Sequence, residues 1–402
     1  LQTADSAHQT IGKFIGLAVF SSDAMSSVAY APQEMLIVLV AAGTAGFVYS
    51  IPLAVAIVIL LAILTLSYEQ TIHTYPNGGG AYIVSRDNLG EIPALVAAAA
   101  LLTDYVLTVA VSISSGVAQV ISAAPNLESY RVAIAVAMVI LITVVNMRGV
   151  KESGSAFAIP SYFFVVMMVL TVGVGMFRYL VLGSLGQVVA PPQDLMHEVI
   201  QPISIFLILK AFSSGTTALT GVEAISNGIT AFKEPRSKNA GATLIMMACI
   251  LGTLMLGITF LSHQTGVLPS EEETVISQLA RTVFNDRGFL YLAAITSTTV
   301  ILMLAANTAF AGFPWLAALT AQDGYLPRQL TYRGSRLVYS RGIIALAGVA
   351  ILLIMIFSAN VTRLIPLYAI GVFLSFTLSQ AGMAYRWYKS GKVKPGEEVQ
   401  ER

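Results

Sequence analysis

The chain has 402 residues, of which 56% are hydrophobic and only 11% are charged, with a mean hydropathy of +0.78. Soluble domains carry about 25% charged residues, so the composition excludes an ordinary soluble protein and indicates an integral membrane protein. The net charge of +1 argues against a nucleic-acid-binding surface, and the single cysteine, Cys249, excludes a disulfide framework or a cysteine-based metal site.

Apolar segments long enough to cross a bilayer recur along the chain. A transmembrane helix needs about 20 apolar residues, and on this basis the sequence predicts ten spans. They cover residues 13–42, 47–71, 93–124, 131–148, 156–183, 201–231, 241–264, 287–320, 342–359 and 362–388. The first and sixth spans carry polar, glycine or proline clusters in their middles. Irregular backbone at membrane depth is tolerated where it lines a cavity, so these clusters predict broken helices.

The basic residues predict the orientation. With a cytoplasmic N-terminus, 16 of the 22 Lys and Arg residues fall on the cytoplasmic side and 4 on the opposite side, while Arg178 and Lys210 lie within spans. By the positive-inside rule, we expect a plasma-membrane protein with both ends of this chain in the cytoplasm. Residues 1–12 then form a cytoplasmic N-terminal segment, and residues 389–402 a cytoplasmic tail that continues in a longer native chain.

Ten spans with both ends on one side divide into five plus five, over residues 13–183 and 201–388. An odd number of spans in each half gives the halves opposite topology. The expected fold is therefore an all-α inverted repeat, as in many secondary transporters, with discontinuous helices 1 and 6 around a central substrate site. Phe20-Ser21-Ser22-Asp23 in the first span and Phe212-Ser213-Ser214-Gly215 in the sixth offer modest support for this equivalence.

Carboxylates inside the predicted spans are the strongest functional signal, because an ionisable residue at membrane depth is costly and usually marks a substrate or ion path. Asp23 and Glu34 lie in the first span, Asp104 in the third and Glu223 in the sixth. Structural roles stay open for two of them: Glu34 near the outer interface, and Glu223 paired with Lys210 or capping a broken helix. We expect Asp23 and Asp104 to be functional.

Asp104 begins a polar stripe on the third span. Asp104, Thr108 and Ser112 are spaced at i, i+4 and i+8, which places them on one helix face, and Tyr105 lies beside them. Their oxygens are the ligands with which a hard monovalent cation replaces its hydration shell. A stripe of Thr and Ser alone would indicate helix packing, but the carboxylate favours a cation site.

The sixth and tenth spans add further candidates. The stretch Thr216–Glu223 combines hydroxyls, a glycine that permits unwinding and a carboxylate. Glu223 is a candidate carrier of a coupling proton, because a partly buried carboxyl can alternate between its protonated and ionised forms. Tyr368, which follows Pro366, is a candidate to close the pocket. No nucleophile, histidine and acid set is visible, and no two histidines have metal-ligand spacing, so we expect neither an enzyme nor a resident cofactor.

Two motifs resemble the amino acid-polyamine-organocation (APC) superfamily. They are Pro76-Asn77-Gly78-Gly79-Gly80-Ala81-Tyr82 and Gly221-Val222-Glu223-Ala224-Ile225-Ser226, the latter followed by Lys233-Glu234-Pro235. The resemblance covers nearly the whole chain and implies the LeuT-like fold with 5+5 inverted repeats. Amino acid permeases of this superfamily hold the substrate carboxylate at a glycine-rich break. Here Asp23 stands at that break and would repel a carboxylate, which favours a cationic substrate.

Within that superfamily, Ser22–Tyr30 together with Thr103-Asp104-Tyr105 closely resembles the KimA-type, Kup-related potassium importers. This resemblance implies proton-coupled potassium import by alternating access, further spans and a cytoplasmic domain outside this chain, and a possible homodimer through those parts. The positions that match the potassium and proton pathway are Asp23, Tyr30, Asp104, Tyr105, Thr108, Ser112, Thr220, Glu223 and Tyr368. Potassium would bind at Asp23 and Asp104, and Glu223 would carry the proton.

Two other functions stay open. One is a proton-coupled amino acid or amine permease of the same fold, in which Asp23 and Asp104 bind an ammonium group. The other is a passive channel, although broken helices at matched positions in inverted halves favour alternating access. In each case the expected surroundings are the lipid bilayer, and the expected partner is a small cation or a small organic solute.

Overall fold

The computed structural model describes residues 10–76, 78, 80–148, 154–183, 185, 201–270, 273–332 and 339–390. Within these ranges the regular structure is helical, apart from one isolated β-bridge between Ile11 and Phe232. The all-α class expected from the sequence is confirmed. Residues 391–402 of the predicted tail, most of the N-terminal segment, and Asn77 and Gly79 of the glycine-rich motif lie outside the described residues.

In chain order the α-helices are α1 (Lys13–Phe20), α2 (Ser22–Ser26), α3 (Ala31–Val40), α4 (Thr44–Phe47), α5 (Ser50–Thr74), α6 (Ala81–Leu89), α7 (Glu91–Ala123), α8 (Arg131–Met147), α9 (Gly154–Leu182), α11 (Ile205–Gly215), α12 (Ala224–Asn227), α13 (Arg236–Thr265), α14 (Val275–Phe284), α15 (Phe289–Gln322), α16 (Ser340–Ile356) and α17 (Val361–Ser390). The short 3₁₀ helices are η2 (Ser27–Ala29), η3 (Pro125–Tyr130), η4 (Thr216–Leu219), η5 (Ile229–Ala231) and η6 (Arg328–Thr331).

Eight of the described helical segments are long and apolar enough to cross a membrane, judged by length and composition. A further segment, Lys13–Phe20 with Ser22–Val40, passes the same test as a pair that is bent by 55°. With the shorter apolar helix α16, these segments fall on the ten predicted spans. Between the second and third of these segments, the helix α6 begins at the end of the glycine-rich motif.

The first span is interrupted where its serines cluster. α1 ends at Phe20, and Ser21 adopts a φ of −103° and a ψ of 0° before the short α2 begins. The hydroxyls of Ser26 and Ser27 donate to carbonyl oxygens three residues earlier, at 2.8 and 2.5 Å. Such local bonds compete with the helical ladder. The chain then passes through η2 and resumes as α3, with Pro32 in its first turn, where proline is tolerated.

A second interruption follows α11. Helix α11 ends at Gly215, η4 covers the next four residues, and Thr220 is extended with a ψ of 148°. Gly221 then has a φ of 76°, in the left-handed region that suits glycine. The hydroxyl-rich stretch singled out in the sequence therefore coincides with an interruption of the α-helix.

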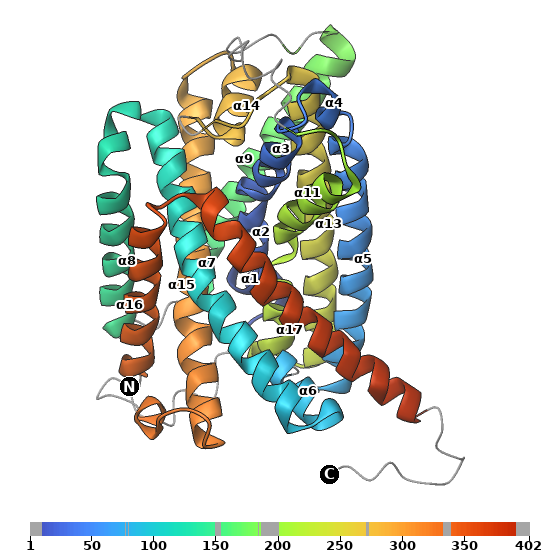
Figure 1. Cartoon of the computed structure of the whole chain (residues 1–402), viewed down its shortest axis with the longest axis vertical. Helices are drawn as coiled ribbons and strands as arrows, with labels where there is room; N and C mark the ends of the chain where they lie inside the picture. The colour runs from blue at the N-terminus through green and yellow to red at the C-terminus, as the bar shows by residue number, and fades with distance from the viewer. Residues whose placement is uncertain are drawn as a thin grey trace.

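The two interrupted segments meet inside the bundle. Helix α2 packs against α13 and α15, and α3 packs against α11, while the long helix α7 packs against both α15 and α17. In Figure 1, α1 and α2 are seen behind α7 and α17, with α4 and α14 at one end of the bundle and α6 at the other. All five residues of α2 are buried. Polar residues of α2 are thus enclosed by protein.

Candidate functional site

Asp23 lies against the second interrupted segment. A β-carbon placed on Gly221 would be 2.7 Å from the amide nitrogen of Ala24 and 2.9 Å from Oδ2 of Asp23. Real β-carbons do not approach other atoms so closely, so only glycine permits this contact. Ser27 Oγ also lies 2.9 Å from the carbonyl oxygen of Ala218. The two segments, about two hundred residues apart in sequence, therefore touch at Asp23.

Two pairs of hydroxyls join the interrupted segments to the surrounding helices. The Tyr30 hydroxyl lies 3.3 Å from Oγ1 of Thr220, and the Thr108 Oγ1 lies 3.0 Å from the hydroxyl of Tyr368. All four side chains are at least 98% buried. These contacts connect four separate elements of the chain at one level of the bundle. They bring four of the predicted site residues together in two pairs.

The Asp104 carboxyl is close enough to those of Asp23 and Glu223 to interact electrostatically with both. Oδ1 of Asp23, Oδ1 of Asp104 and Oγ of Ser112 are buried and receive no hydrogen bond from the described residues. No Lys or Arg of the described chain forms an ion pair with any of the three acids. Buried polar atoms are nearly always paired, so unpaired oxygens among acids indicate a place for a cation or for protons.

Glu223 is held by three donors. Its Oε2 accepts from the hydroxyls of Tyr68 and Ser375, each at 3.2 Å, and its Oε1 accepts from Nδ2 of Asn227 at 3.2 Å. Lys210 is exposed, so pairing of Glu223 with Lys210, one of its possible structural roles, is wrong. Glu223 instead ties α5, α12 and α17 together beside the second interrupted segment.

Tyr105 lies between this cluster and α15. A β-carbon on Gly312 would approach the Tyr105 hydroxyl to 2.7 Å, so the ring packs directly on the α15 backbone. Tyr105 also interacts with Asn227, the residue that donates to Glu223. On its other side Asn227 touches the glycine-rich motif, because a β-carbon on Gly80 would lie 2.2 Å from its Oδ1. The motif thus supports the cluster from one end of the bundle.

Sequence reasoning missed three of the residues that surround Glu223: Tyr68, Ser375 and Asn227. Tyr68 and Ser375 occur within long apolar helices, where a single polar residue is usually a packing residue. Asn227 lies four residues after Glu223, and this i, i+4 spacing is the one sequence signal that could have identified it. Tyr68 and Ser375 are identified only by their proximity to Glu223 in space.

The arrangement offers a cation mainly oxygen ligands. Among the described residues, no group of three or more His, Cys, Asp or Glu side chains has the geometry to hold a metal ion. The available ligands are instead two aspartates and several hydroxyls. Such a set suits a weakly held monovalent cation better than a transition metal, which prefers nitrogen or sulfur ligands.

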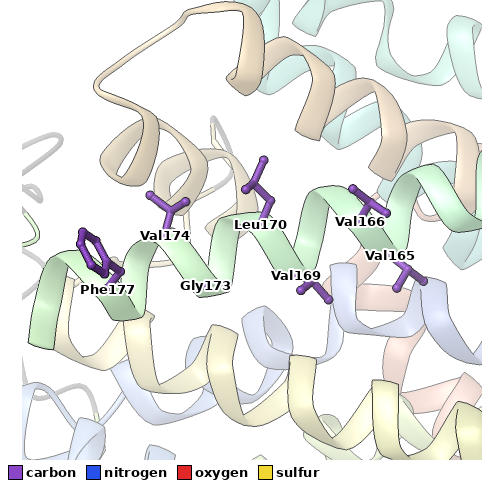
Figure 2. Close-up of a pocket in the computed structure, with 7 residues that line it drawn as sticks. All are labelled: Val165, Val166, Val169, Leu170, Gly173, Val174 and Phe177. Atoms are coloured by element: carbon purple, nitrogen blue, oxygen red, sulfur yellow. The ribbon is translucent and has the colours of Figure 1, made fainter.

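A concave surface on α9 has different chemistry. Figure 2 shows its seven lining residues along one side of that helix. They are Val165, Val166, Val169, Leu170, Gly173, Val174 and Phe177. Since none of these side chains carries a polar atom, the surface offers no ligand to a cation. It is separate from the acidic cluster.

Residues 11–396 match the protein-family model described as amino acid permease. The chain belongs to the amino acid permease family. The superfamily membership expected from the motifs is thereby confirmed, and with its apolar helices the permease is a multi-pass membrane protein.

The permease is also 49% identical, over 390 residues, to the potassium transporter KimA of Bacillus subtilis (strain 168). The alignment covers 97% of this chain and 63% of KimA, so the chain spans less than two thirds of that relative's length. Two solved structures of the manganese transporter of Eremococcus coleocola, one of a mutant and one with an aromatic bis-isothiourea compound, overlay with TM-scores of 0.40 and 0.39. They are 12% and 13% identical and cover 92% of this chain and 76% of theirs.

Proposed function

We propose that the permease forms part of a secondary active transporter that imports potassium together with protons by alternating access. The observation that carries this proposal is the cluster of three carboxyls, with buried oxygens of Asp23 and Asp104 that find neither a hydrogen bond nor an ion pair among the described residues. An ionised carboxylate left in this state is strongly destabilising, and a bound cation or proton relieves the cost. Similarity to the potassium transporter KimA supports potassium as the cation.

The proposed potassium ligands come from four elements. Asp23 and Asp104 supply negative charge, and the neighbouring oxygens belong to Tyr30, Tyr105, Thr108, Ser112, Thr220 and Tyr368. Glu223 is the proposed proton carrier, since its three hydrogen-bond donors hold the carboxyl in place in either protonation state. Potassium and the proton are the transported species, and no resident cofactor is part of the proposal.

The proposed architecture consists of two inverted repeats, residues 13–183 and 201–388. The interruptions between α1 and α3 and between α11 and α12 are then the discontinuous helices of the two repeats. Both ends of this chain are proposed to face the cytoplasm of a plasma membrane. Contacts of a homodimer are proposed to lie in the part of the relative's length that this chain does not span.

A second candidate is a proton-coupled amino acid or amine permease, which the family description favours. In that case Asp23 and Asp104 would bind an ammonium group instead of potassium. A potassium tracer and a labelled amine, offered to the same vesicles, separate the two functions. Amine uptake that potassium does not inhibit would favour the second candidate.

The deciding experiment measures potassium-tracer uptake into proteoliposomes with and without an inward proton gradient. Wild type is compared with Asp104→Asn, which keeps the size of the side chain but removes its charge. Asp87→Asn is the matched control, because Asp87 lies on α6 and is partly exposed beside Arg86. We expect gradient-driven accumulation in wild type and in the control, and loss of uptake in Asp104→Asn. Normal uptake by folded Asp104→Asn would contradict the proposal.

A further inference from the structure

One buried acid lies outside the cluster described above. Glu34 is in the first turn of α3 and is only 2% exposed. Within the described ranges its one side-chain hydrogen bond comes from Thr362, whose Oγ1 donates to Oε1 of Glu34 at 3.1 Å. Glu34 lies four residues after Tyr30, so the two occupy the same face of the chain as it leaves the first interruption.

No cation faces Glu34 in the described part of the chain. Titratable side chains on the elements around α3 include Lys210 on α11, Tyr68 on α5, His263 on α13, Arg281 on α14, and Arg363 and Tyr368 on α17. Lys210 and Arg363 are exposed. The others have partners elsewhere: Glu223, Ser50, Glu273 and Thr108, respectively. A buried ionised carboxylate with one neutral donor would be strongly destabilising, so the conformation seen here requires a neutral, protonated Glu34.

Helix α17 connects Glu34 to the rest of the site. Thr362 contacts Glu34, Tyr368 contacts Thr108, and Ser375 contacts Glu223. With a helical rise of about 1.5 Å per residue, Thr362 is about 9 Å from Tyr368 along the axis. Helix α17 thus contacts Glu34, the proposed potassium site and the proposed proton carrier.

Thr362 also covers Glu34 from the outside of the molecule. Thr362 is itself exposed, whereas the preceding Val361 is buried, with 9% of its surface exposed. Next to Glu34, the side chain of Gln33 accepts from the amide of Val275 at the start of α14. Movement of α17 or α14 away from α3 would therefore bring water to Glu34, which would then ionise without a large desolvation cost.

We infer that Glu34 is a second proton-binding carboxyl, which must take up a proton before α3 and α17 can close on each other. This inference rests on the proposed function in one respect. The proposed orientation places α3 on the outer side of the membrane, so the proton at Glu34 comes from outside. Closing binds one proton at Glu34 and opening returns it to the same side. Glu34 thereby makes closure of the outer path sensitive to external pH. Its proton is separate from the transported proton that Glu223 carries.

The test follows opening of the α3–α17 contact and does not require transport. Cys249 is the only cysteine and is exposed, so Cys249→Ala gives a cysteine-free protein. In that background Val361→Cys reports the buried side of the contact. Arg363→Cys is the exposed reference that corrects for the pH dependence of thiol labelling itself. Both are labelled with a maleimide in nanodiscs at several pH values.

We expect the labelling rate of Val361→Cys, relative to Arg363→Cys, to rise with pH. Because opening releases one proton, this ratio can rise by at most about tenfold per pH unit. In Glu34→Gln, which keeps an oxygen for Thr362, the ratio is expected to stay low and independent of pH. Glu69→Gln is the matched control, because Glu69 is a partly exposed acid paired with His73, and it should behave as wild type.

A ratio that does not change with pH when Glu34 is present would overturn the inference, and so would the same rise in Glu34→Gln. The first of these outcomes needs no substitution at Glu34, so a folding defect in Glu34→Gln leaves the test intact. Absence of potassium uptake by wild-type vesicles would refute the proposed function alone, since the labelling experiment contains no potassium gradient.

Discussion

Replacement of Gly221 by alanine tests the contact on which the proposed cation site depends. The residue has a φ of 76°, and a β-carbon would approach the Ala24 nitrogen to 2.7 Å and Oδ2 of Asp23 to 2.9 Å. The left-handed backbone costs a residue with a side chain about 1–2 kcal/mol. Overpacking against a fixed backbone atom adds about 1–3 kcal/mol. We therefore expect Gly221→Ala to lower the free energy of unfolding by about 2–5 kcal/mol.

Two other glycines separate these contributions. Gly324 also has a positive φ, 89°, but a β-carbon there would meet nothing within 4 Å. Gly324→Ala should therefore show the backbone cost alone. Gly348 has an ordinary φ and equally open surroundings inside α16, so Gly348→Ala should be neutral or stabilising by up to about 1 kcal/mol.

The assay is thermal unfolding of the three purified variants in one detergent, followed by potassium-tracer binding. Gly221→Ala is expected to be the least stable and, because the new methyl group displaces the Asp23 carboxylate, to bind potassium at least about tenfold more weakly, which corresponds to about 1.4 kcal/mol. If Gly221→Ala were as stable as Gly324→Ala and bound potassium as wild type does, the close approach of the two interrupted segments would have no energetic consequence.

Two further predictions concern the surroundings of the site. Tyr68→Phe and Ser375→Ala each remove one donor to Glu223. Each is expected to cost about 1–2 kcal/mol of stability and to reduce proton-driven accumulation, and unchanged unfolding and uptake in both would contradict the assigned contacts. Burial and the Asp323 carboxylate, 2.5 Å away, raise the pKa of Tyr82 on α6 to about 12. Folding therefore favours the neutral phenol, and its stabilisation is complete below pH 10 and is lost as the pH rises through 12. The unfolding temperature should fall over this range more steeply in wild type than in Tyr82→Phe, and equal slopes would refute the assignment.

Much of the fold follows from local properties of the sequence. Span length and apolarity are properties of contiguous residues, so the ten predicted spans coincide with helices in the structure. The interruptions were also predictable, because serine and threonine hydroxyls compete locally for backbone carbonyls and Gly221 permits a positive φ. The short helix α14 was not predicted, since ten residues of mixed polarity resemble an ordinary loop.

The site divides in the same way. The sequence by itself determined the membrane class and singled out four acids within apolar segments, because the cost of a charge in hydrocarbon depends on the residue and its near neighbours. Only the tertiary structure decided what those acids meet: Gly221 against Asp23, Tyr68 and Ser375 at Glu223, and Thr362 over Glu34. These partners are separated from the acids by 152 residues or more. No local pattern records such pairings, because they arise when separate helices pack and must satisfy each other's buried polar atoms.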